Sequence, residues 1–162
     1  MSIETFHQNP IDIVEEVIHH KNWNFSRSHD HELVADIYTS MSQYRLYFNW
    51  SESLKSINFT VTFDLKFSQS KYLNIYELLA KINENLWIGH FDITSKSGII
   101  AYRQTFFLPN QNDMLFKQLD DLVDISVYEC EKYYPAFNNL FFEDTSVTDA
   151  LELCSLNVIG RA

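Results

Sequence analysis

The clearest pattern of hydrophobic and polar positions runs from residue 56 to residue 67. Apolar side chains occupy every second position, and polar side chains lie between them. The apolar set is Ile57, Phe59, Val61, Phe63, Leu65 and Phe67. A period of two places the two sets on opposite faces of a strand, and a slip of one residue would move every aromatic ring into water. The pattern therefore predicts a strand inside an antiparallel sheet that has one solvated face.

Shorter alternations predict further strands over residues 32–38, 43–50, 91–94 and 99–108. Polar or small residues separate neighbouring strands at 39–42 and 95–98, and Gly98 in the second of these turns can adopt a positive φ. Both connections are short, so each pair of strands is expected to form an antiparallel hairpin.

Helical periodicity appears in four segments. Residues 10–22 follow a cap at Asn9 and a first helical position at Pro10. A second helix is expected over residues 69–87, and Gly89 is expected to end it. This helix has one apolar stripe, which consists of Tyr72, Ile75, Tyr76, Leu79, Ile82 and Leu86. A long helix is expected from Asn112 or Asp113 to Tyr134, where Pro135 would stop it. The fourth segment, around residues 147–154, is weaker.

The predicted order is α-β-β-β-α-β-β-α, an α+β fold in which an antiparallel sheet of about five strands is backed by helices. A length of 162 residues suits one domain over 1–162. Its core is expected at about 9–142, with a tail at 143–162 that is weakly helical or flexible.

The net charge of the chain excludes some classes of binding partner. The formal net charge is −10, and the basic residues do not cluster. Such a chain repels phosphate backbones and anionic lipid surfaces, so neither nucleic acid nor a membrane is expected as a partner. The first ten residues lack the pattern of a secretory signal, which predicts the cytoplasm. Cys130 and Cys154 have no metal-ligand spacing and are expected to be buried apolar side chains.

Motifs that carry strong catalytic chemistry are absent from the sequence. Three glycines cannot build a phosphate loop or a dinucleotide-binding turn, and no serine elbow or zinc-binding helix motif occurs. No cofactor is therefore expected. His29 and His31 could share a face of an extended segment, but two imidazoles do not close a metal site, and a solvated loop is the favoured interpretation. Asp64 lies on the polar face of the strand over residues 56–67, where a solvated position is again favoured.

Four segments resemble the YbjN family, whose members are labelled bacterial sensory transduction regulators. They are residues 63–66 (FDLK), 76–84 (YELLAKINE), 86–92 (LWIGHFD) and 129–137 (ECEKYYPAF). The resemblance extends from about Asn9 to Phe142 and is most specific between Tyr76 and Phe91. It implies a fold like that of type III secretion chaperones, small acidic proteins that usually dimerise and hold segments of other proteins. It implies no catalytic residues, because the family has no established activity.

Two functions remain open. The first is a non-enzymatic protein-binding or regulatory module, homodimeric by the resemblance, whose aromatic-rich surface holds a peptide or partner domain. Aromatic residues are 15% of the chain and commonly anchor interfaces, so the candidates are Trp50, Trp87, His90 and Phe91. Trp87 is also a candidate for a structural wedge between the central helix and the sheet. The second function is a small-ligand sensor or an enzyme, with a pocket that uses His90, Asp92 or Asp64.

Overall fold

The segment with the clearest alternation is the longest strand of the sheet. In the computed structural model, which describes residues 9–108 and 115–159, β4 spans Ser56–Lys66. Its alternating apolar side chains are buried, whereas Asn58, Asp64 and Lys66 are exposed. The predicted strand and its solvated face are confirmed.

Six antiparallel strands form one sheet in the spatial order β1-β2-β3-β4-β6-β5. The other five strands are β1 (Asn24–His29), β2 (Glu32–Tyr38), β3 (Gln43–Ser51), β5 (His90–Thr94) and β6 (Ile99–Phe107). The chain leaves β4 through a helix, forms β5 at the edge, and returns with β6 between β5 and β4. Both predicted hairpin turns are present, and Gly98 has a φ of 71°.

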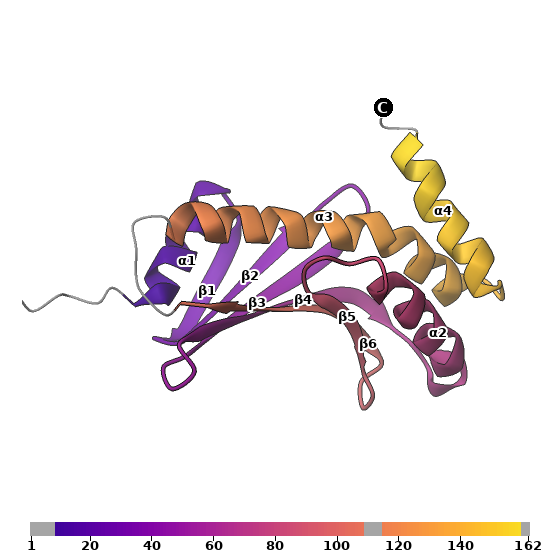
Figure 1. Cartoon of the computed structure of the whole chain (residues 1–162), viewed down its shortest axis with the longest axis horizontal. Helices are drawn as coiled ribbons and strands as arrows, with labels where there is room; N and C mark the ends of the chain where they lie inside the picture. Colours follow the sequence, from indigo (N-terminus) through magenta and orange to yellow (C-terminus); the bar gives the residue numbers. More distant parts are fainter. Residues whose placement is uncertain (1–8, 109–114, 160–162) are drawn as a thin grey trace, which may run out of the picture.

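The helices cover one face of this sheet (Figure 1). They are α1 (Pro10–His20), the short 3₁₀-helix η1 (Gln69–Lys71), α2 (Tyr72–Asn83), α3 (Leu115–Phe142) and α4 (Val147–Ile159). Helix α3 crosses the sheet, with α1 near its beginning and α2 and α4 near its end. The predicted α+β class, with an antiparallel sheet backed by helices, is confirmed.

Strand β1 was missed by the sequence analysis, so the sheet has six strands where about five were predicted. Phe25 is the only apolar side chain of β1, and an edge strand needs few of them. Arg27, on the face turned toward α1, pairs with Asp12 at 2.7 Å and with Glu15 at 3.0 Å. A charged side chain therefore joins β1 to α1. Because this contact is not hydrophobic, β1 lacks the alternation of apolar residues that would have predicted a strand.

Pro135 lies inside α3 and does not end it, contrary to the prediction. Proline lacks the N–H that would bond to the carbonyl of Glu131, and a proline inside a helix costs about 3 kcal/mol. The helix continues because Ala136, Phe137 and Leu140, beyond the proline, are all buried against the core. Burial of these side chains outweighs the missing hydrogen bond.

Two other helix boundaries differ from the predictions. Helix α2 ends at Asn83, so Gly89 belongs to the following loop, where its φ is 68°. Helix α1 ends at His20, two residues before the predicted end at Asn22. The predicted start of the long helix at Asn112 or Asp113 lies outside the described residues.

An ion pair joins α1 to α3. The ammonium group of Lys21, just after α1, lies 2.7 Å from Asp120 and 2.6 Å from Asp124. Burial favours a lower pKa for Lys21, but the two carboxylates outweigh it and raise the pKa. The same interaction with Lys21 lowers the pKa of Asp120. Charged Asp120 thus stabilises the folded chain.

We predict that Asp120→Asn lowers the free energy of unfolding by about 1 kcal/mol at pH 7. A carboxyl group with a lowered folded pKa stabilises the protein above its unfolded pKa, and this contribution is lost as the pH falls through the folded pKa. The difference from wild type should therefore shrink below pH 3.8, the ordinary pKa of this carboxyl group. Urea unfolding across this pH range measures the difference in the free energy of unfolding.

Asp121→Asn, which removes an exposed ion pair with Lys117, is the control and should change stability less. An equal loss at neutral and acid pH would contradict the linkage.

Candidate partner-binding surface

Two of the four predicted partner-binding residues belong to the core. Trp50 is 8% exposed and Phe91 is 2% exposed. The ring of Phe91 packs against Phe63, Tyr102 and Phe137, with centroid distances between 5.2 and 6.0 Å. Neither Trp50 nor Phe91 can contact a partner while the protein is folded, which removes both from the candidate set.

The other two predicted residues lie on the surface. Trp87 is 100% exposed, in the loop between α2 and β5, so it is no wedge between the helix and the sheet. His90 begins β5 on the open face of the sheet, opposite Arg103 of β6. The structure therefore keeps Trp87 and His90 as candidates.

Helix α2 has a second apolar surface that the sequence analysis did not find. Its buried side is formed by Ile75, Leu78, Leu79 and Ile82. On the opposite side, Leu73 is 82% exposed, Tyr76 is 46% exposed, and Ala80 is also exposed. The spacing of residues 73, 76 and 80 places them along one side of the helix. We call this set the α2 outer surface. The prediction that Tyr76 belongs to the buried stripe is therefore wrong.

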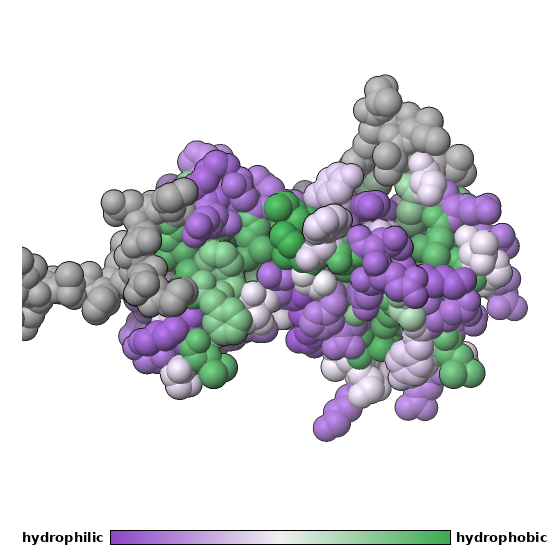
Figure 2. All heavy atoms as spheres, in the orientation of Figure 1, coloured by the Kyte–Doolittle hydropathy of each residue, from purple (hydrophilic) through white to green (hydrophobic). Residues whose placement is uncertain are grey.

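Two carboxylates lie on the same side of the helix. Glu77 follows Tyr76, and Glu84 lies one helical turn after Ala80. Both glutamates are exposed. Glu77 pairs with Lys81 at 3.2 Å, while Glu84 follows the last residue of α2. Figure 2 shows apolar groups reaching the surface in this region, interrupted by hydrophilic ones. The surface is thus apolar with acidic positions along it.

The loop that carries Trp87 is anchored at both ends. The side-chain amide of Asn83 accepts a hydrogen bond from the N–H of Phe91 at 2.8 Å and donates one to its carbonyl oxygen at 3.0 Å. The hydroxyl of Tyr102 donates to the carbonyl of Ile88 at 2.7 Å. Burial raises the pKa of Tyr102 to about 12, so this hydroxyl keeps its proton at neutral pH. These bonds fix the two ends of the loop from which Trp87 projects.

The backbone of Gly89 requires a glycine. Its φ is 68°, and a Cβ atom there would meet the ring of Tyr102 and lie 2.8 Å from the carbonyl oxygen of Arg103. Glycine therefore allows the loop to turn closely over Tyr102 into β5. A sequence pattern can mark this residue as a turn, but only the structure shows the ring beneath it.

The predicted metal and pocket residues do not assemble into a site. His29 and His31 are exposed near the β1–β2 turn, and residues 9–108 and 115–159 contain no group of three or more histidine, cysteine or acidic residues that could hold a metal ion. Asp92 pairs with Arg103 at 3.3 Å on the open face of the sheet. Strand β6 lies between Asp92 and Asp64, which puts the two carboxylates about 10 Å apart or more.

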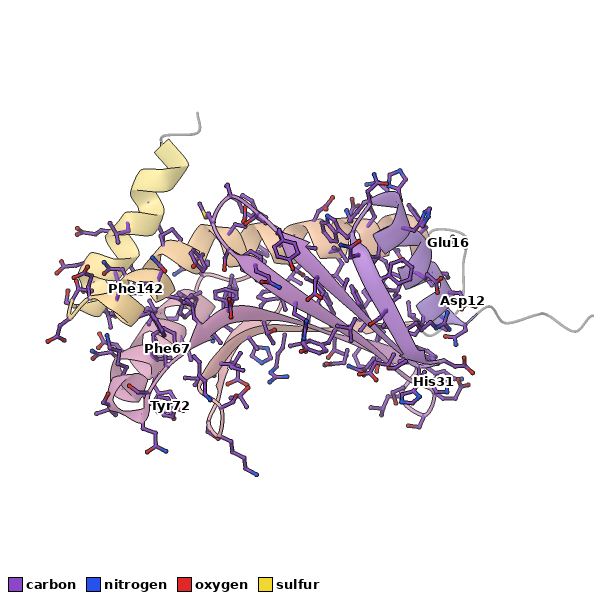
Figure 3. The ribbon with its side chains drawn as sticks, turned by 180° about the vertical axis from the view of Figure 1, so that it is seen from behind. Asp12, Glu16, His31, Phe67, Tyr72 and Phe142 are labelled. Carbon is purple, nitrogen blue, oxygen red and sulfur yellow. The ribbon has the colours of Figure 1, made fainter. Side chains whose placement is uncertain are left out.

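Two hollows lie elsewhere on the molecule. One, of about 840 Å³, is bounded by α2, α3 and α4 and includes Lys81, Lys132 and Cys154 in its lining. The other, of about 670 Å³, lies beside α1 and is lined by Asp12, Glu15, Glu16, His19, His20, Arg27 and Phe116. Figure 3 shows Asp12 and Glu16 at the opposite end of the molecule from Tyr72 of α2. None of the predicted site residues lines either hollow.

A protein-family model named YbjN and described as "Putative bacterial sensory transduction regulator" matches residues 10–139. This confirms the resemblance found in the sequence. A solved structure described as "Crystal structure of YbjN, a putative transcription regulator from E. coli" is similar in fold, with a TM-score of 0.53 and 12% sequence identity. The similarity covers 74% of this chain and 84% of that one. No curated protein matches the sequence significantly. Within the described residues, no helix combines the length and apolar character needed to cross a membrane.

We predict that Asn83→Leu lowers the free energy of unfolding by about 2 kcal/mol, because it leaves the part-buried N–H of Phe91 without its acceptor. The loop should also become more mobile, which time-resolved fluorescence anisotropy of Trp87 can measure in a Trp23→Phe, Trp50→Phe background. Asn85→Leu is the matched control, since the side chain of Asn85, two residues after the end of α2, donates to the carbonyl of Lys81 at an exposed position. If the two variants were equally stable, the anchoring role of Asn83 would be ruled out.

Proposed function

The chain belongs to the YbjN family, and we propose that it acts as a regulator by binding another protein through the α2 outer surface. The observation that carries this proposal is the exposure of Leu73 and Tyr76 on α2 and of Trp87 in the loop that follows this helix. Large apolar and aromatic side chains that stay in water are typical of interaction sites, and Trp and Tyr are the commonest anchors. Binding, with no chemical step, is the activity proposed.

The chemistry of the surface defines the partner. The apolar side chains of the α2 outer surface fit the apolar side of an amphipathic helix or strand. Glu77 and Glu84, in a chain with a net charge of −10, favour basic residues beside that apolar side. We therefore expect a basic amphipathic segment of another protein to be the ligand. Such holding of segments would resemble the action of a secretion chaperone, and a homodimer would present two surfaces.

A small-ligand sensor is the second candidate. The hollow between α2, α3 and α4 has a volume of about 840 Å³, within the range of ligand pockets, and combines Lys81 and Lys132 with Tyr133 and Leu151. Thermal-shift screening of the purified protein against nucleotides and metabolites tests this reading. Reproducible stabilisation that Lys132→Ala removes would favour it. The cytoplasmic location stays a prediction under either function.

We predict that Trp87→Ala weakens partner binding by about 2 kcal/mol, roughly thirtyfold, because a fully exposed indole can be buried completely at an interface. Affinity purification from bacterial lysate identifies the partner, and titration calorimetry with the purified partner measures the loss. Leu73→Ser should have a smaller effect in the same direction. Phe107→Ala removes another exposed aromatic ring, 68% exposed at the far end of β6, and should leave the affinity unchanged. Equal effects of Trp87→Ala and Phe107→Ala would rule out the α2 outer surface.

A further inference from the structure

Helix α4 is separable from the rest of the fold. The family model ends at residue 139, whereas α4 begins at Val147. The connecting residues 143–146 form neither helix nor strand. Helix α4 contacts mainly α3 and, to a lesser extent, α2, and Figure 1 shows it beyond the end of the sheet. The sheet and the three other α-helices are therefore complete without it.

An apolar stripe in the first part of α4 attaches this helix to the domain. Val147, Ala150 and Cys154 are buried, and their spacing of three and four residues puts them on one side of the helix. The thiol of Cys154 lies close to the backbone of Ala136 in α3, and burial raises its pKa, so it is a protonated apolar contact. This is the mode in which an amphipathic helix binds in a groove. The groove is formed by α2 and α3.

The fit of α4 in this groove is incomplete. The hollow of about 840 Å³ remains between α4 and α2. It carries two ammonium groups, from Lys81 of α2 and from Lys132 of α3, beside the carboxylate of Glu84. The ammonium of Lys132 lies 5.0 Å from the ring centre of Tyr133, and among the described carboxylates none forms an ion pair with it. Helix α4 in turn contains Asp149 and Glu152 and no basic residue.

We propose that the α2–α3 groove is a second protein-binding site, which α4 occupies within the chain and which an acidic amphipathic helix of a partner protein occupies when α4 detaches. Apolar residues spaced like Val147, Ala150 and Cys154 enter the groove, and acidic residues of the partner reach Lys81 and Lys132. A helix tethered by a short linker has a local concentration in the millimolar range, so α4 excludes weak competitors. The proposal does not depend on the α2 outer surface, although the two sites meet where Lys81 pairs with Glu77.

A labelled peptide of residues 144–159 serves as the probe helix, and fluorescence anisotropy measures its binding to the full-length protein. In Ala150→Asp, a buried carboxylate on the stripe expels α4, and we expect the peptide to bind at least tenfold more tightly than to wild type. Thr148→Asp, at an exposed position of α4 that does not line the hollow, is the matched control and should behave like wild type. Adding Trp87→Ala to Ala150→Asp should not change peptide binding, which separates this site from the α2 outer surface. Equal peptide affinity for Ala150→Asp and wild type, with circular dichroism showing both folded, would overturn the proposal.

Hydrogen–deuterium exchange of the wild-type chain provides a test without a variant. If α4 detaches while the domain stays folded, amides of residues 151–155 should exchange at least a hundredfold faster than those of residues 126–137 in α3. Equal protection of the two helices would show that α4 opens only when the whole chain unfolds, and would overturn the proposal. The proposal would also be overturned if the wild-type protein were a dimer and Ala150→Asp dissociated it. In that case the groove would bind a second copy of the chain.

Discussion

Aromatic rings from three parts of the chain meet where α3 crosses the sheet. Phe137 of α3 contacts Phe63 of β4 at 5.4 Å and Phe91 of β5 at 5.6 Å between ring centroids. This packing holds the part of α3 beyond Pro135 against the sheet and fixes the edge strand β5 from its inner side. Because the backbone of Phe91 also bonds to Asn83, the same packing holds the end of α2 and the loop with Trp87. The end of α3, from which α4 departs, depends on it as well.

A second contact ties the beginning of α2 to the end of α3. The ammonium of Lys71, at the start of α2, donates to the carbonyl oxygens of Leu140, Phe141 and Glu143 at 2.6 to 3.2 Å. The last carbonyls of a helix lack partners within it, and a positive charge is favourable at that end. Helix α2 is thereby fixed to α3 on one side while its outer surface remains in water. The groove for α4 and the α2 outer surface thus lie on two sides of one well-anchored helix.

The two proposed surfaces differ in charge, although they share α2. The α2 outer surface has the carboxylate of Glu77, and the groove has the ammonium group of Lys132. Lys81, which pairs with Glu77, and Glu84, which also lines the hollow, lie between the two surfaces. Complementary charge selects partners more than it adds affinity. Under the two proposals, one helix would bind a basic segment on one side and an acidic segment on the other.

Residue type alone did not decide which candidate side chains are exposed, because burial depends on elements that are distant in the sequence. Trp87 was expected either as an anchor or as a structural wedge and is exposed, whereas Trp50 and Phe91 fit an interface and a core equally well by residue type and are buried. In α2, apolar residues occur on both sides of the helix, so periodicity assigned Tyr76 to the core. The packing of α3 and β5 against α2 determines which side of this helix is buried. A local sequence pattern does not show this packing.

The sequence by itself determined the α+β class, most of the strands, the hairpin turns and the family, because alternation, helical period and turn residues are local properties of the chain. Only the tertiary structure decided that β1 joins the sheet, since β1 is held by backbone pairing with β2 and by ion pairs between Arg27 and residues of α1. It also decided that α3 continues through Pro135, because the burial of residues beyond the proline outweighs the lost hydrogen bond. The same holds for the exposure of Leu73 and for the groove under α4. Burial is a property of surfaces that meet from distant parts of the chain, so it appears only when the chain is folded.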